Sequence, residues 1–271
     1  MNTTPSEESV PPTELHLYDQ PDLSLLQALE DPSHLSLLEL RFCHLSDLSP
    51  LAELHQLTTL ELWGCGQVRD LSPLAALSRL TTLSISYCDQ VSDLSPLFGL
   101  KALTMLTLST CDQVSALSPL TGLQALTTLR VYLCSQVQDL SPLAALPQLT
   151  SLLLHGCQQV SDLSPLAALS QLTRLTLFSC QQVSDLSPLA DLTHLTHLDL
   201  CFCQSVSDLS PLAGLQALET LELSYCTQVS DLSPLAGLQA LTRLSLYGCG
   251  RRIRAGRLRP LAGLRNLTIG R

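Results

Sequence analysis

LTTLELWGCGQVRDLSPLAAL, residues 57–77, is the stretch that decides the fold, because its pattern recurs along the chain. Cysteines follow one another every 23 residues from Cys65 to Cys249, and prolines do the same from Pro50 to Pro234. The shared skeleton is LxxLxLxxCxxVxDLxPLxxL. A fixed period between about 20 and 50 residues indicates a stack of repeated units rather than one compact globule.

The two parts of the unit predict different elements. Leu60 and Leu62 alternate with polar neighbours, which is typical of a short strand with one buried face. Ser72 and Pro73 predict the start of a short helical or 3-10 segment, with the serine as cap and the proline at the first helical position. No unit can bury its apolar residues alone, so we expect the units to stack in parallel around one continuous core.

This skeleton resembles the leucine-rich repeat family, whose pattern LxxLxLxx(N/C)xL is matched across residues 35–250, with cysteine in place of the asparagine ladder. The DLSPL turn resembles the bacterial subclass with 22-residue repeats found in internalin-like proteins. Residues 43–50 fit that subclass without a gap, whereas each later unit carries one more residue after the cysteine. The resemblance implies an α/β fold: a right-handed solenoid with parallel strands on the concave face and short helical or 3-10 segments opposite.

The ends of the chain depart from the pattern. We expect a disordered segment at residues 1–13, a degenerate N-terminal capping repeat at 14–34 with a strand at 15–17, repeats of 22–23 residues at 35–250, and a basic partial repeat at 251–271. The last strand would begin at about Leu267 and have no cap. Its uncovered edge either lies under the basic tail or allows self-association.

Charge and composition narrow the classes of partner and the compartment. The formal net charge is −10, which disfavours nucleic acid as a partner even though half of the 14 basic residues lie in 251–271. No apolar run reaches the roughly 18 residues needed to span a membrane. The first residues lack the pattern of a signal peptide, and 11 cysteines without one indicate a reducing compartment, so we expect a cytoplasmic protein. Delivery into a host cell as an effector is the alternative.

The periodic polar residues are expected to be structural. Buried cysteines at this position should satisfy backbone groups as free thiols, and there is no CxxC pair that would indicate a metal site. The glutamine column from Gln67 to Gln182, with Gln228 further along, could bond along its row. The aspartate column from Asp47 to Asp231 should accept backbone N–H groups before each Ser-Pro. A cation bound by the aspartate row is the less favoured alternative, and no cofactor is expected.

One set of residues has a catalytic composition. His197, Asp199 and Cys201 alternate, so they should face outward from one strand. Residues two apart on a strand are separated by roughly 6.7 Å, which is too far for a nucleophile and its base. We therefore expect no catalytic residues, no small-molecule substrate and no enzymatic activity.

The outward strand positions are the ones that the repeat does not dictate. Eight of the ten aromatic residues occupy the two positions before the cysteine. Aromatic and arginine side chains dominate protein–protein interfaces, although rings that merely cover the turn are the alternative. The predicted binding residues are Trp63, Arg130, Tyr132, Leu153, His155, Arg174, Phe178, His197, Asp199, Phe202, Tyr225 and Tyr247.

These observations favour a non-enzymatic solenoid that presents its concave face and adjacent aromatic rim to a protein partner. The alternative is a substrate-recognition module or effector subunit of a ubiquitin-ligase-type or other enzyme complex. In that case the catalytic residues would belong to another chain.

Overall fold

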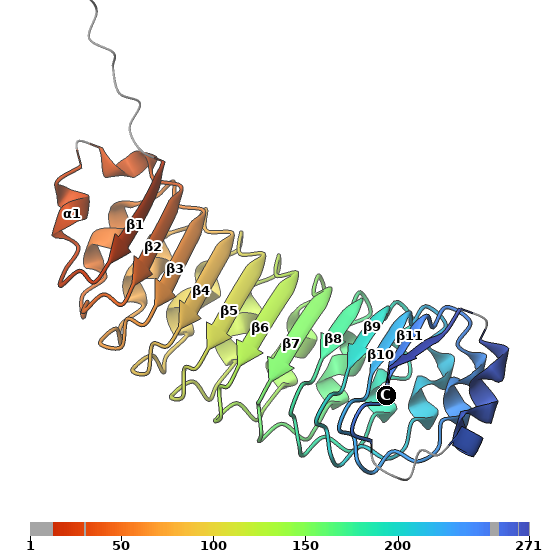
Figure 1. Ribbon diagram of the computed structural model, residues 1–271. Coiled ribbons are helices and arrows are strands. Elements are labelled where there is room, and N and C mark those ends of the chain that lie inside the picture. Colours follow the sequence, from red (N-terminus) through yellow and green to blue (C-terminus); the bar gives the residue numbers. More distant parts are fainter. Residues whose placement is uncertain (1–12, 30, 250–254, 265, 271) are drawn as a thin grey trace, which may run out of the picture.

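A computed structural model describes residues 13–29, 31–249, 255–264 and 266–270. Within them, twelve strands form one sheet in the order of the sequence, and every neighbouring pair is parallel. The strands make one wall of an elongated stack, and short helices make the opposite wall (Figure 1). The leucine-rich repeat solenoid predicted from the period is confirmed. The expected disorder of residues 1–13 concerns a segment that lies, except for Thr13, outside the described residues.

The strands are β1 Glu14–Tyr18, β2 Leu37–Arg41, β3 Thr59–Trp63, β4 Thr82–Ser86, β5 Met105–Ser109, β6 Thr128–Tyr132, β7 Ser151–His155, β8 Arg174–Thr176, β9 His197–Asp199, β10 Thr220–Glu222, β11 Arg243–Ser245 and β12 Thr268–Gly270. One α-helix, α1 Ser24–Gln27, lies near the N-terminus. The 3-10 helices are η1 Pro32–His34, η2 Ser49–Glu53, η3 Ser72–Ala76, η4 Ser95–Gly99, η5 Ser118–Gly122, η6 Ser141–Ala145, η7 Ser164–Ala168, η8 Ser187–Leu189, η9 Ser210–Gly214, η10 Ser233–Gly237 and η11 Ala255–Gly263.

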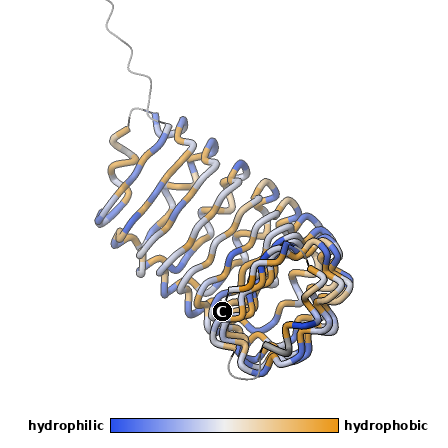
Figure 2. The backbone as a smooth tube through the Cα atoms, turned by 45° about the vertical axis from the view of Figure 1, so that its right-hand side comes forward, coloured by the Kyte–Doolittle hydropathy of each residue, from blue (hydrophilic) through white to orange (hydrophobic). Residues whose placement is uncertain are grey.

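Leucine columns fill the space between the two walls. In β3, Leu60 and Leu62 have no exposed surface, while Glu61 between them faces outward. Figure 2 shows hydrophobic positions at the same places in successive coils of the backbone. Full burial of a leucine side chain contributes about 1.5–3 kcal/mol, and each unit obtains this burial only by contact with its neighbours.

The turn before each 3-10 helix corrects one sequence expectation. Ser72 was predicted to cap the helix, but the N-cap position is Leu71, and Ser72 is the first helical residue. The capping side chain is that of Asp70, two residues before Ser72. Asp70 Oδ1 accepts the Ser72 N–H at 2.8 Å, and Asp70 Oδ2 accepts the Ser72 hydroxyl. The expectation that the aspartates accept backbone N–H groups is thus confirmed, and the same bond recurs in most units.

A threonine column joins the units at the start of each strand. The Thr81 hydroxyl donates to the Thr58 carbonyl oxygen at 3.0 Å, and the same contact links Thr104 to Thr81 and Thr127 to Thr104. The Thr58 carbonyl oxygen also accepts the N–H groups of Thr81 and Thr82. The contacts of this column were not predicted, although threonines recur there with the 23-residue period.

The C-terminal strands are shorter than the N-terminal ones. Strands β1 to β7 have five residues, and β8 to β11 have three. In the C-terminal units a tight turn directly follows the strand. The Cys203 N–H donates to the Leu200 carbonyl oxygen at 3.0 Å across this turn. The thiol changes its contacts there too: Cys65 Sγ lies near the carbonyl oxygens of Leu40 and Trp63, whereas the contact of Cys203 Sγ is with the Leu177 oxygen alone.

Candidate binding surface

The outer face of the sheet changes character along the stack. Strands β4 and β5 present small or neutral residues such as Ser84, Thr107 and Ser109. Strands β6 to β8 present large or charged residues in the same columns. We call this second region the central patch; its residues are Arg130, Tyr132, Leu153, His155, Arg174 and Phe178.

The sheet register brings the central patch together. Arg130 pairs with Leu153 across β6 and β7, and Tyr132 pairs with His155. Arg174 on β8 pairs with Ser151 of β7, diagonally beside Leu153. Since neighbouring strands lie about 4.8 Å apart, these side chains share one area rather than being scattered.

Aromatic rings form a continuous row along the rim of the sheet. The aromatic row consists of Tyr132, His155, Phe178, Phe202, Tyr225 and Tyr247, and successive ring centroids lie 5.9, 4.6, 5.1, 4.4 and 5.4 Å apart. Such spacings are those of favourable ring pairs, each of which adds about 0.5–1.5 kcal/mol beyond burial. Each ring of the row therefore packs against its neighbours along the stack.

The rings of the aromatic row come from two successive positions of the repeat. One is the last position of the five-residue strands, and the other is the next residue, which has a positive φ in every unit. Phe202 and Tyr225 hold φ values of 62° at that position, while Gly156 and Gly248 occupy it elsewhere. A Cβ on Gly156 would lie 2.6 Å from Leu133 Cδ2, and one on Gly248 would lie 2.5 Å from the Tyr225 ring. At these two turns a side chain of the preceding unit occupies the space of a Cβ, and the positive φ also favours glycine.

Trp63 lies apart from the other predicted residues. It belongs to β3, three strands before β6, and its ring packs on Tyr87 with centroids 4.8 Å apart. Tyr18 and Phe42 form a similar pair at 5.6 Å. Tyr18 was not singled out from the sequence because its repeat is degenerate, yet it pairs with Arg41 in the register of the rim column.

The remaining predicted residues lie on β9 or in the turns that follow β9, β10 and β11, beside the central patch. His197 pairs with Arg174 and Asp199 with Thr176 across β8 and β9. Burial, the positive charge of Arg174 and that of Arg243 lower the pKa of His197, although Glu219 opposes them. Tyr225 and Tyr247 extend the aromatic row toward the C-terminal end.

Cys201 is not the exposed side chain that its position led us to expect, although it is not part of the leucine core either. Strand β9 ends at Asp199, and Cys201 is only 9% exposed. Its N–H donates to Asp199 Oδ1 at 2.8 Å. Burial and the Asp199 carboxylate raise the pKa of the thiol to about 12, so Cys201 is protonated at neutral pH and is a poor nucleophile.

The periodic cysteines are free and buried. The Cys88 thiol lies 3.9 Å from the Leu62 carbonyl oxygen of the preceding unit and 3.4 Å from the Ser86 carbonyl oxygen of its own. Burial raises the pKa of Cys88 to about 12. The column therefore supplies weak donors to backbone carbonyl groups, as predicted from the repeat position.

The aspartate column and the glutamine column lie on the outside of the turns. A backbone hydrogen bond from Ser187, followed by one from its hydroxyl, lowers the pKa of Asp185 despite the neighbouring carboxylates. The expected bonding along the glutamine row is not found at Gln90, whose Oε1 accepts a hydrogen bond from Arg69 at 2.7 Å. In the described parts of the chain, no group of three or more His, Cys, Asp or Glu side chains is arranged to hold a metal ion.

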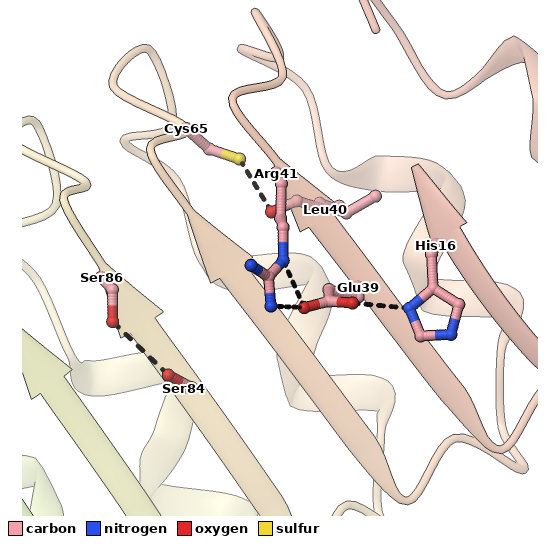
Figure 3. A network of polar contacts seen from close by, with 7 residues as sticks. All are labelled: His16, Glu39, Leu40, Arg41, Cys65, Ser84 and Ser86. Atoms are coloured by element: carbon pink, nitrogen blue, oxygen red, sulfur yellow. Dashed lines mark hydrogen bonds and ion pairs between the residues drawn. The ribbon is translucent and has the colours of Figure 1, made fainter. Parts of the chain in front are cut away.

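A polar network at the N-terminal end was not predicted. Glu39 on β2 bonds to His16 of β1 and to Arg41, as Figure 3 shows. Burial raises the pKa of Glu39, but the hydrogen bonds from His16 and Arg41 outweigh this effect and lower it overall. Glu61, on the next strand, has a raised pKa because of its own burial and the nearby Glu39 carboxylate.

No helix in the described residues has the length and apolar character needed to cross a bilayer. A family model described as leucine-rich repeats in two copies matches residues 170–214. The comparison with curated proteins finds no match.

Solved structures give the closer assignment. An internalin (inlF) from Listeria monocytogenes is 27% identical, with 95% of this chain and 86% of that chain covered and a TM-score of 0.53. Internalin C2 (inlC2) from the same species is 34% identical, with 69% of this chain and 79% of that chain covered and a TM-score of 0.60. The TLR13–ssRNA13 complex, at 21% identity, shares the fold alone; 94% of this chain and 41% of that chain are covered, with a TM-score of 0.68. Repeat pattern, parallel sheet and identity to internalins agree, and the chain belongs to the internalin-like leucine-rich repeat proteins.

Proposed function

We propose that this chain is a non-enzymatic protein-binding solenoid, which holds a protein partner against the central patch and the aromatic row. The observation that carries the proposal is the contrast within one repeated scaffold. Every unit has the same buried leucines, yet Arg130, Leu153 and Phe178 stand where β4 and β5 have serines and threonines.

The aromatic row suits an interface for two physical reasons. Its rings present large apolar area, and their mutual contacts restrict them before binding, so little side-chain entropy is lost on association. Tyrosine and arginine are also the residues most enriched among interface hot spots. We further propose a cytoplasmic location, in keeping with 11 cysteines that are all free.

The test is affinity capture from the source cells with the intact chain and with the Tyr132→Ala/Phe178→Ala variant. The matched control is Phe98→Ala, because Phe98 is an exposed ring (52%) on η4, the opposite wall of the stack. The intact chain and the control should recover the same partner, and the double variant should bind the purified partner at least about tenfold more weakly. Equal recovery by all three chains would contradict the proposed surface.

A further inference from the structure

Most basic side chains between residues 13 and 249 are engaged within the molecule. The Arg41 guanidinium pairs with Glu39, and Lys101 Nζ donates to the Gly122 carbonyl oxygen at 2.8 Å. Arg69 bonds to Gln90 and Arg79 to Gln56, both on the turns away from the sheet face. These four cations therefore have polar partners of their own.

The arginines on the outer face of β6, β8 and β11 are different. Arg130 Nη1 contacts only the Met105 sulfur, at 4.0 Å. Neither Arg174 nor Arg243 has a carboxylate within ion-pair distance among the residues that the structure describes. A chain with a net charge of −10 thus leaves these three guanidinium groups without intramolecular counter-ions among its described residues.

Two of these arginines flank an apolar residue. The nearest outward acid in the sheet register is Asp199 of β9, diagonally beside Arg174 on the side away from Leu153, and it makes no ion pair with Arg174. Arg130 lies beside Leu153, and Arg174 lies diagonally across from it. From strand spacing and rise, the backbones of Arg130 and Arg174 are roughly 12 Å apart. No outward residue of β6, β7 or β8 is acidic. Arg243 is separated from Arg174 by strands β9 and β10, where His197 and Thr220 fill its column, and so lies outside the site.

We propose that the central patch docks an extended acidic segment of the partner protein, with an apolar side chain on Leu153 and carboxylates on Arg130 and Arg174. In an extended chain, residues i, i+2 and i+4 share one face, and residues i and i+4 are roughly 13 Å apart. A Glu-x-Leu-x-Glu segment therefore offers acid, apolar side chain and acid at a spacing that the long arginine side chains can meet. This inference rests on the proposed function and specifies the chemistry of the partner.

A protein segment fits the site better than a nucleic acid does. Nucleic-acid binding relies on several phosphate contacts, commonly about 6–10, and on an excess of positive charge. The central patch offers two arginines around a leucine, on an acidic body whose turns carry the aspartate column. The apolar centre instead matches a leucine or phenylalanine between two carboxylates.

The experiment uses the full chain and a short fluorescein-labelled peptide with a central Glu-Ser-Leu-Ser-Glu. Comparison peptides carry Gln-Ser-Leu-Ser-Gln and Lys-Ser-Leu-Ser-Lys, and single-stranded oligouridylate is a further arm. The acidic peptide should bind at least about tenfold more tightly than either comparison peptide, and its affinity should fall as salt rises from about 0.05 to about 0.5 M. Equal binding of the three peptides, or tighter binding of the oligouridylate, would overturn the inference.

Substitutions of arginine test whether the acidic peptide binds at the central patch. Arg130→Glu/Arg174→Glu should weaken the acidic peptide at least about tenfold and favour the lysine peptide instead. Arg69→Glu/Arg79→Glu makes the same charge change on the turns and should leave peptide binding intact. Arg130→Gln/Arg174→Gln gives the same answer if charge reversal impairs folding. Sedimentation should show one monomeric species; a dimer dissolved by the Arg130→Glu/Arg174→Glu change would mean that a second copy, not an acidic partner, occupies the patch.

The two proposals can fail separately. If Tyr132→Ala/Phe178→Ala abolishes partner capture while Arg130→Gln/Arg174→Gln has no effect, the binding surface stands and the acidic segment is wrong. If neither variant affects capture, both proposals are wrong.

Discussion

The units around β4 and β5 and the units around β6 to β8 share one interior and differ on their outer face. Leu106 of β5 and Leu175 of β8 occupy the same column and are both buried. Thr107 of β5 stands in the column that holds Arg130 of β6 and Leu153 of β7. The difference shows that this scaffold encodes its stability and its surface in separate columns, so that one can be changed without the other.

The largest expected effect tests whether the interiors are equivalent. Leu106→Ala and Leu175→Ala should each lower the free energy of unfolding by about 2–5 kcal/mol, because each removes a fully buried side chain between packed neighbours. The outward substitutions Thr107→Ala and Thr176→Ala should cost less than about 0.5 kcal/mol. Denaturant unfolding measures all four. Similar costs for the inward and outward changes would mean that the assigned faces are wrong.

The next effect concerns the turn column beside the central patch. Gly156→Ala should cost about 1–2 kcal/mol, because the residue has a φ of 67° and its new Cβ would lie 2.6 Å from Leu133 Cδ2. Adding Leu133→Ala should recover part of this loss by removing the clash. Gly66→Ala, where a Cβ would meet nothing within 4 Å, is the control and should be nearly neutral in thermal unfolding.

The threonine column should act alike in both regions. Thr104→Val and Thr173→Val each remove a hydroxyl that donates to a carbonyl oxygen at 3.1 Å. We expect each to cost about 0.5–1 kcal/mol, because the carbonyl oxygen keeps its two N–H donors. Thr176→Val, on the outer face, should be neutral or slightly stabilising, and a cost equal to that of Thr173→Val would count against a role for the hydroxyl.

The smallest expected effect on stability concerns Glu61 of β3, which lies near Glu39 of β2 on the outer face of the sheet. The pKa of Glu61 is raised in the folded chain, by burial first and by Glu39 second. The contribution of Glu61 to the free energy of unfolding is therefore fully present below about pH 4.3, the pKa of glutamate in the unfolded chain. It is lost as the pH rises through the raised pKa of the folded chain. Glu61→Gln should stabilise by a few tenths of a kcal/mol near pH 7 and by nothing near pH 3.

Glu39 provides the control of opposite sign. Hydrogen bonds from His16 and Arg41 lower its pKa in spite of burial, so its contribution is present above about pH 4.3 and is lost as pH falls. Glu39→Gln should therefore destabilise near neutral pH and have no effect near pH 3. The same sign for both substitutions at neutral pH would contradict the assigned interactions.

Much of the fold could be predicted because the period places each residue type in a column. The 23-residue repeat predicted the strands, the buried leucines, the thiol contacts and the aspartate bonds. The cap at Ser72 was assigned wrongly because the serine and the aspartate two residues earlier both have capping side chains, and only geometry shows which backbone N–H is free. Nothing in the residue pattern predicted that β1 to β7 would have five residues and β8 to β11 three.

The candidate surface was predictable in position and less so in arrangement. The aromatic residues before each cysteine were visible in the sequence, but their linkage through His155 depends on rotamers and on a backbone turn with positive φ. Gly64, Gly156 and Gly248 mark that turn at multiples of the repeat length, which was an available signal. The low exposure of Cys201 was not predictable, because alternation indicates a facing only while the strand continues and β9 ends at Asp199.

The threonine contacts also make the molecule modular. Each hydroxyl reaches only the unit before it, so a whole unit can be removed and the column rejoined. Deleting residues 82–104, one complete period, would follow Thr81 with Met105, which pairs with Thr82 in the sheet. The stack would shorten by about 4.8 Å, the strand spacing, and the central patch would be unchanged. We therefore expect that the length of the stack can be altered independently of the central patch.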